Sequence, residues 1–136
     1  ADKIASVQSL AGAMFLEPAE HVPAEPVHVL QVHGTADKSI KYDGGCWEGR
    51  CYPSARETVE MWAGFNQCKM VPEQGGTLDL VRNVEGEDTT VLCYKNDETK
   101  KVSELWTIHG ASHSPRFNLT YSPRIVDWLL TNRKSD

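Results

Sequence analysis

The chain has 136 residues and a formal net charge of −5, with 40% hydrophobic and 24% charged residues. This composition is ordinary for a globular domain and argues against disorder. The negative charge and the scattered basic residues argue against nucleic acid or a membrane surface as partner, because both need clustered cations. No stretch reaches the roughly 20 apolar residues that span a bilayer.

The first part of the chain predicts two strands. Residues 4–10 are expected to form a short strand, and a proline-rich connector follows. Residues 27–32 form a nearly continuous apolar, β-branched run between Pro26 and Gly34, which is typical of a strand buried on both faces of a parallel sheet. Residues 33–45 are rich in Gly, Asp, Lys and Ser and predict a loop.

The rest of the chain predicts alternating helices and strands. Apolar residues recur at helical spacing between Pro53 and Cys68, and Ser122 with Pro123 predicts the start of a final amphipathic helix. The strands expected here span residues 77–84, 89–94 and 102–108, the first two as a hairpin with a turn at 85–88. Alternation of strands and helices predicts an α/β architecture, in which strands 4–10, 27–32 and 102–108 are parallel neighbours.

Four cysteines at positions 46, 51, 68 and 93 allow three disulfide pairings. We favour Cys46–Cys51, which flank a Gly-containing loop, together with Cys68–Cys93, which lie at the end of a helical pattern and in a strand. The alternative is four free thiols in a reducing compartment. Paired C-x2-C knuckles are absent, so we expect no zinc ribbon.

Two polar side chains follow the C-terminal ends of predicted strands, where ligands bind in open α/β sheets. Asp37 follows strand 27–32 on a Gly-bearing turn, and His113 follows strand 102–108 among small residues. Taken singly, each is more simply a turn or surface residue. Together they predict an acid that orients a histidine general base, in the chain order of the Ser-Asp-His triad.

A metal site is the rival interpretation of this region. His109 and His113 are four residues apart, which suits a metal pair on a helix. Gly110 and Ser114 disfavour a helix, and the glutamate of an HExxH motif is absent. We therefore expect no metal and no cofactor. The alternative at this site is a metal-dependent hydrolase that uses Asp37, His109 and His113 as ligands.

Three segments resemble the polyhydroxybutyrate depolymerase and feruloyl esterase family of α/β-hydrolases. Residues 33–45, HGTADKSIKYDGG, resemble its acid loop, and residues 53–68 resemble the helix that follows. Residues 106–114, WTIHGASHS, occupy the place of its Gly-Gly-Gly-His-Ser segment. The resemblance covers nearly the whole chain and implies the C-terminal portion of an α/β-hydrolase fold, with three parallel strands, helices and a small hairpin in one domain over residues 1–136.

The resemblance also implies functions for individual residues. It makes Asp37 the triad acid and His113 the triad base, and it places His33 and Tyr42 at substrate-binding positions that shape the cleft. The family is largely secreted and commonly carries a cystine near the positions of Cys68 and Cys93. Its substrates are feruloyl and acetyl-type esters or polyhydroxyalkanoate esters.

The family nucleophile is missing. It is a serine in a G-x-S-x-G motif upstream of the acid and the base, and this sequence contains no such motif. We therefore expect part of a secreted serine esterase that works with the N-terminal half of the same enzyme, in a second chain or a parent polypeptide, or that associates with itself. The alternative is a non-catalytic binding or scaffold protein that retains a partial hydrolase fold.

Overall fold

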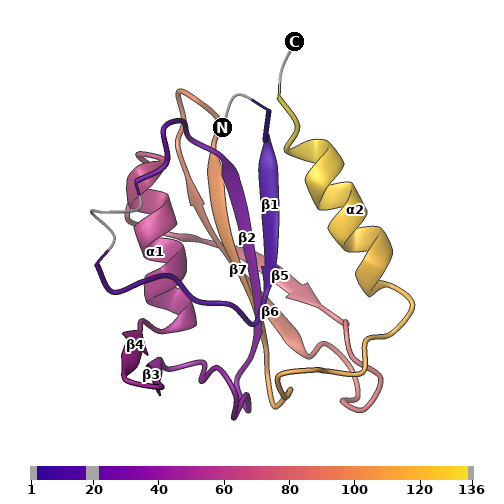
Figure 1. The fold of residues 1–136 in the computed structure, drawn as a ribbon. Helices are drawn as coiled ribbons and strands as arrows, with labels where there is room; N and C mark the ends of the chain where they lie inside the picture. Colours follow the sequence, from indigo (N-terminus) through magenta and orange to yellow (C-terminus); the bar gives the residue numbers. More distant parts are fainter. Residues whose placement is uncertain (1–2, 18–21, 135–136) are drawn as a thin grey trace.

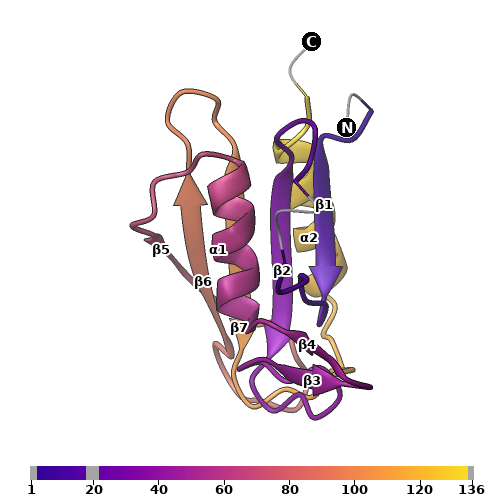
Figure 2. The same ribbon diagram turned by 60° about the vertical axis from the view of Figure 1, so that its left-hand side comes forward.

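The computed structural model describes residues 3–17 and 22–134. They form a five-stranded sheet with one helix on each face (Figures 1 and 2). The sheet has the order β1-β2-β7-β6-β5. Its strands are β1 (Ser6–Leu10), β2 (His28–Gly34), β5 (Glu73–Leu78), β6 (Thr89–Lys95) and β7 (Val102–Ile108). Strands β1, β2 and β7 run parallel, whereas β6 and β5 are antiparallel to their neighbours.

The predicted portion of an α/β-hydrolase fold is wrong. The sheet is mixed, and the described residues contain only two short helices, α1 (Ala55–Phe65) and α2 (Tyr121–Thr131). The three strands expected to be parallel neighbours do pair side by side, but the hairpin extends the same sheet instead of standing apart from it. Strands β6 and β7 are joined by residues 96–101 alone. That connection is shorter than the dozen or so residues of a parallel crossover, so the pair is antiparallel.

The predicted first strand of the hairpin is displaced. Strand β5 ends at Leu78, and the connection to β6 turns inward instead of lying on the surface. The buried carboxylate of Asp88 accepts hydrogen bonds from the backbone N–H of Leu80 and Val81, at 3.1 and 2.9 Å. These bonds satisfy buried backbone donors, and Leu80 and Val81 reach the core with exposures of 0% and 2%.

Helix α1 begins where the sequence provides a cap. The Ser54 hydroxyl accepts the N–H of Glu57, and the Glu57 carboxylate accepts the N–H of Ser54, which completes a capping box. Ala55, Val59 and Ala63 recur at helical spacing and are buried against the sheet. The predicted helix in this region is therefore confirmed, with tighter bounds.

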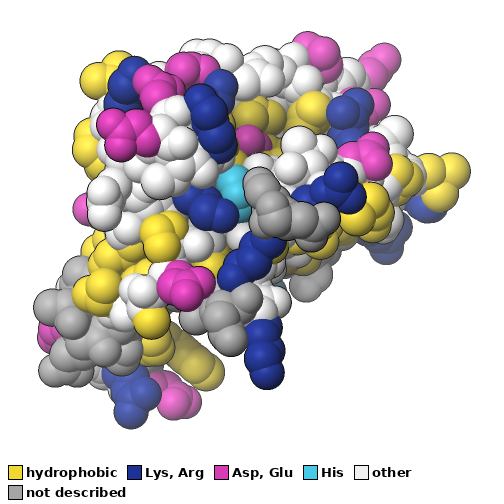
Figure 3. All heavy atoms as spheres, turned by 90° about the horizontal axis from the view of Figure 1, so that it is seen from above, with side chains coloured by type: hydrophobic (Ala, Val, Ile, Leu, Met, Phe, Trp, Pro, Cys, Tyr) yellow, Lys and Arg dark blue, Asp and Glu magenta, His cyan; other side chains and the backbone are white. Residues whose placement is uncertain are grey.

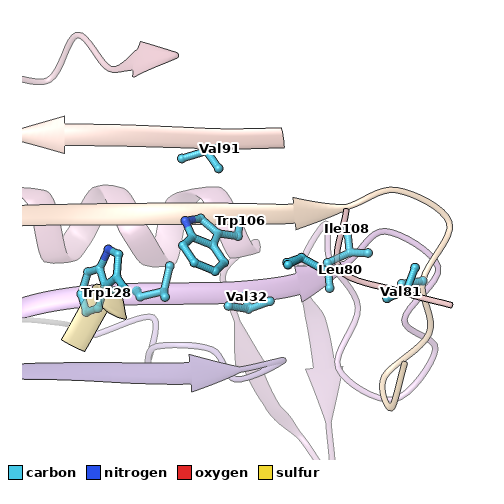
Figure 4. Packing of buried hydrophobic residues seen from close by; sticks show 9 residues of the cluster. Val32, Leu80, Val81, Val91, Trp106, Ile108 and Trp128 are labelled. Atoms are coloured by element: carbon cyan, nitrogen blue, oxygen red, sulfur yellow. The ribbon is translucent and has the colours of Figure 1, made fainter. Parts of the chain in front are cut away.

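The opposite face of the sheet carries the larger core, which packs partly against α2 (Figure 4). Its buried members include Leu30 and Val32 of β2, Trp106 and Ile108 of β7, and Trp128 of α2. Successive side chains of a strand point to opposite faces. Strand β2 packs against α1 on the other face and is buried along its whole length. This confirms the prediction of a strand buried on both faces.

One predicted disulfide is present and the other is not. Cys46 and Cys51 are joined across a small hairpin of β3 (Gly45–Trp47) and β4 (Arg50–Tyr52). The predicted Cys68–Cys93 bond is wrong, because both residues are buried free thiols. Cys68 packs with the buried residues of α1 on one face of the sheet, whereas Cys93 lies with Trp128 on the face that carries α2. The sheet separates the two sulfur atoms.

The surface seen in Figure 3 is the end of the molecule from which β2 and β7 start. Acidic and basic side chains are interspersed there, without a large area of one sign. None of the helices in the described part of the chain has the length and apolar character needed to cross a membrane.

Candidate functional site

The site is built from the loops that follow β2 and β7, at the lower end of Figure 1. Backbone hydrogen bonds join the two loops directly. The N–H of Thr35 donates to the carbonyl of Ile108 at 3.0 Å, and the N–H of Ala36 donates to the carbonyl of Ala111 at 2.9 Å. The Thr35 hydroxyl accepts the N–H of Gly110 at 2.8 Å. The two loops therefore hold each other in a fixed relative position.

Gly34 makes this close approach possible. A Cβ atom at this position would lie 2.2 Å from the carbonyl oxygen of Ala111 and 2.7 Å from its carbonyl carbon. Both are backbone atoms, which cannot move aside as the end of a flexible side chain can. A side chain at position 34 would separate the acid loop from the histidine loop.

Asp37 lies at the centre of the site, with 5% of its surface exposed. Its Oδ1 accepts the backbone N–H of Ser39 at 2.8 Å and of Ile40 at 3.0 Å. Its Oδ2 lies 2.8 Å from Nδ1 of His113. The acid and the histidine that the sequence analysis paired are thus in hydrogen-bond contact.

These contacts determine the charge of Asp37. Burial alone would raise the pKa of its carboxyl, because it disfavours the charged form. The hydrogen bond from His113 and the backbone N–H groups of Ser39 and Ile40 outweigh burial, and the pKa of Asp37 is lowered from its ordinary value. The group is therefore a carboxylate at neutral pH, which is the state needed to orient a histidine.

His113 presents its other ring nitrogen outward. The side chain is 42% exposed, and within the described residues Nε2 has no hydrogen-bond partner, since its contact is made by Nδ1. With Asp37 as a carboxylate, Nδ1 carries the proton and donates it, which leaves the lone pair on Nε2. The tautomer follows from the hydrogen-bond network.

His33 supports Asp37 from the buried side. Its Nε2 lies 3.1 Å from Oδ2 of Asp37 and 2.9 Å from the carbonyl of Ile40, and its Nδ1 lies 3.2 Å from the amide nitrogen of Gln31. The same amide nitrogen donates to the carbonyl of Gly12 at 2.6 Å. The predicted contact of His33 with substrate finds no support in this placement, because the residue is 1% exposed; it is a positioning residue.

Tyr42 and His109 lie on the α1 side of the site. The Tyr42 hydroxyl is 2.7 Å from Oγ1 of Thr107, and its ring meets the ring of His33 edge to face. His109 Nε2 is 3.0 Å from Oγ1 of Thr90. Tyr42 and His109 line a hollow of about 220 Å³. The substrate-binding role of Tyr42 stays a prediction.

The rival metal site finds no arrangement to support it in the described ranges, 3–17 and 22–134. They contain no group of three or more His, Cys, Asp or Glu side chains placed to hold an ion. His113 faces Asp37, while His109 pairs with a threonine hydroxyl on another strand.

Sequence reasoning missed two features of the site. Gln31 belongs to the network behind Asp37, and its position two residues before His33 in a strand was the signal that both face the same side. The second feature is a hollow of about 550 Å³ beside the Cys46–Cys51 hairpin, whose lining includes Phe15, Ile40, Trp47 and Tyr52. Ile40 links this hollow to the Asp37 loop.

No protein-family model matches the chain, and no curated protein matches it. The resemblance to polyhydroxybutyrate depolymerases and feruloyl esterases therefore stays a prediction.

Proposed function

We propose that this chain provides the general base and the orienting acid of a secreted serine esterase. His113 is the base and Asp37 is the acid. One observation carries the proposal: Nδ1 of His113 lies 2.8 Å from Oδ2 of Asp37, while Nε2 has no partner among the described residues and the side chain is partly exposed. A general base needs a free lone pair that its substrate proton can reach.

The chemistry follows from these positions. A serine Oγ attacks the ester carbonyl carbon as its proton passes to Nε2 of His113, and the Asp37 carboxylate stabilises the imidazolium. The tetrahedral intermediate then expels the alcohol oxygen, which takes the proton from Nε2 as the C–O bond breaks. Water attacks the acyl-serine with the same proton transfers, and it releases the carboxylic acid and the serine.

The nucleophile has to come from outside this sequence, which lacks a G-x-S-x-G motif. Strand β1 offers a binding place for the polypeptide that contains the nucleophile. In the described sheet β1 pairs only with β2 and therefore forms an edge. Leu10 of β1 is 41% exposed, and Val126 and Leu130 of the adjacent helix α2 are 51% and 60% exposed. An unpaired strand edge with apolar neighbours favours association. The partner is the N-terminal half of the enzyme or a second copy.

The substrate class rests on the hollow beside the hairpin and on the resemblance. Phe15, Trp47 and Tyr52 give that hollow an aromatic lining suited to the apolar part of an ester. The family resemblance implies feruloyl, acetyl-type or polyhydroxyalkanoate esters. The Cys46–Cys51 disulfide is compatible with the oxidising surroundings of a secreted protein.

The test compares the chain alone with the chain combined with the product of the coding sequence upstream of it. The measurements are hydrolysis of a nitrophenyl ester and labelling by a fluorophosphonate. We expect neither activity alone, and in combination turnover with a label on a serine of the added half. Asp37→Asn should reduce turnover about 10⁴-fold and His113→Gln about 10⁶-fold, while the control His109→Gln should leave it unchanged.

The same experiment decides against the proposal if turnover survives His113→Gln, or if the label lies on a serine of this chain. The alternative, a non-catalytic binding or scaffold protein, is favoured by the missing nucleophile: no described serine hydroxyl is hydrogen-bonded to His113. Absence of labelling in every combination would support that alternative.

A further inference from the structure

The face of the sheet that carries α2 is only partly covered. Helix α2 packs against β1, and Figures 1 and 2 show it on one side of that face. Within the described residues, the other helix, α1, packs on the opposite face against β2, β6 and β7. Strands β5 and β6 therefore have no helix over them on the α2 side.

A hollow of about 510 Å³ lies between α2 and these outer strands. Its lining includes the apolar side chains of Val91, Trp106 and Trp128 together with the Cys93 thiol, and charged side chains of both signs also line it. It also includes Val102 and Glu104, so it lies toward the start of β7. Glu104 is four residues before the end of that strand, about 13 Å along it. The hollow is thus separate from the site at Asp37 and His113.

Trp128 carries an unused donor into this region. Its side chain is buried, with 8% exposure, and its Nε1 is the one buried side-chain nitrogen or oxygen without a hydrogen-bond partner among the described residues. The neighbouring Trp106 differs, because its Nε1 donates to Glu104 at 3.0 Å. In Figure 4 the ring nitrogen of Trp128 lies on the edge turned toward β7 and Trp106. Buried donors in folded proteins almost always have an acceptor.

We propose that this hollow binds a small, uncharged, apolar molecule with a carbonyl oxygen, and that this oxygen accepts a hydrogen bond from Nε1 of Trp128. The apolar lining selects the body of the ligand, and the unused N–H selects the acceptor. Lys95 and Arg124 are balanced by Glu104 and Asp127 around the hollow, so the charges favour neither an anion nor a cation.

The size of the hollow favours a small molecule over a protein segment. A helix about 10 Å across fills roughly 420 Å³ for each 5.4 Å turn, so the hollow holds little more than one turn. Its volume is within the range of about 300–1,000 Å³ typical of small-molecule pockets. This binding site is independent of the proposed esterase function.

The test uses prodan, an uncharged naphthalene with a propanoyl ketone, whose emission reports both the polarity around it and hydrogen bonding to its carbonyl. Prodan is titrated into the full chain, and the four indole N–H resonances are followed by ¹H–¹⁵N NMR. We expect saturable binding and a shift of the Trp128 resonance, with the resonance of Trp62 in α1 unchanged.

A pair of variants separates the hydrogen bond from packing. Trp128→Phe keeps an aromatic ring without the N–H, and we expect it to weaken prodan binding about 3- to 10-fold. It should leave unchanged the binding of 2-dimethylaminonaphthalene, which lacks the carbonyl. Trp62→Phe, in α1 on the other face of the sheet, is the matched control and should change neither affinity.

Four results would overturn the proposal. They are no saturable binding, a shift of Trp47 instead of Trp128, an equal loss of affinity for both probes in Trp128→Phe, and a stable dimer whose formation blocks prodan. The last result would mean that a second copy covers this face. If Trp128→Phe does not fold, the shift of the Trp128 resonance in the native chain decides the question.

Discussion

His28 and the Asp37–His113 pair lie at opposite ends of the same two strands. His28 begins β2, is 6% exposed, and its Nδ1 accepts the backbone N–H of Val102 at the start of β7. Burial, followed by the nearby charge of Lys101, lowers the pKa of His28 to about 4. At the other end a carboxylate faces the imidazole of His113. The surroundings, not the residue type, make one histidine a neutral structural acceptor and the other a candidate base.

The largest expected effect is at the end that holds the pair. Gly34→Ala puts a methyl group 2.2 Å from the carbonyl oxygen of Ala111, and severe overpacking costs about 3 kcal/mol or more. We expect a loss of at least this size in the free energy of unfolding, measured in urea. It should also break the hydrogen bond between Asp37 and His113.

The control for this substitution is Gly64→Ala in α1. A Cβ at Gly64 meets nothing within 4 Å, and alanine in a helix is favoured over glycine by about 0.5–1 kcal/mol. Gly64→Ala should therefore stabilise the chain slightly. A Gly34→Ala protein within 1 kcal/mol of the parent would mean that the two loops are not held as closely as described.

The next largest effect concerns the end of the strands that holds His28, and it is a dependence of the free energy of unfolding on pH. The pKa of His28 is about 4 in the folded chain, while an unperturbed histidine has a pKa of about 6.5. Between these values the unfolded chain binds more protons, so the folded state loses stability as pH falls from about 6.5 to about 4. The full loss is about 3 kcal/mol, and it is measured by urea unfolding at a series of pH values.

His28→Asn should remove most of this slope, because its amide oxygen can replace Nδ1 as acceptor without titrating. Asp37 acts in a lower range: its pKa is lowered, so its contribution is present above the ordinary carboxyl pKa and is lost as pH falls through the folded value. If the free energy of unfolding of His28→Asn depended on pH between 6.5 and 4 as strongly as that of the parent chain, groups other than His28 would cause this dependence.

The smallest effect distinguishes the cysteines of the two ends. Cys46–Cys51 closes a loop of about 6 residues, which in the chain-entropy model stabilises the fold by about 2 kcal/mol. We expect the double variant Cys46→Ser, Cys51→Ser to lose about this much free energy of unfolding.

At the His28 end, the Cys68 thiol lies beside the carbonyl of Lys101. Titration of the unfolded, unreduced chain should find two thiols, from Cys68 and Cys93. Finding no free thiol would support a Cys68–Cys93 disulfide and would contradict the structure.

The sequence predicted the parts of the fold that depend on local pattern. The apolar run before Gly34 indicated a strand buried on both faces, and the loops after two strands indicated where Asp37 and His113 lie. The antiparallel half of the sheet was missed, because its direction follows from the short connection at residues 96–101 and not from composition. The Cys68–Cys93 pairing failed because the sheet face of each residue had not been considered.

The network behind the pair was missed for a related reason. Gln31 and His33 are two residues apart in β2 and therefore face the same side of the sheet. The sequence alone does not indicate what the glutamine contacts there. Its partners, the carbonyl of Gly12 and the ring of His33, come together only through tertiary packing. The hollow with Trp47 likewise arises where the hairpin lies near residues 12–15.

The proposed function depends on Asp37 holding the proton of His113 on Nδ1 and leaving the lone pair of Nε2 open. Long-range ¹H–¹⁵N NMR of the imidazole rings, at a pH well above 6.5, reads this tautomer directly. We expect a protonated Nδ1 and an unprotonated Nε2 for His113, with the preference lost in Asp37→Asn. A proton on Nε2 of His113 in the parent chain would contradict it.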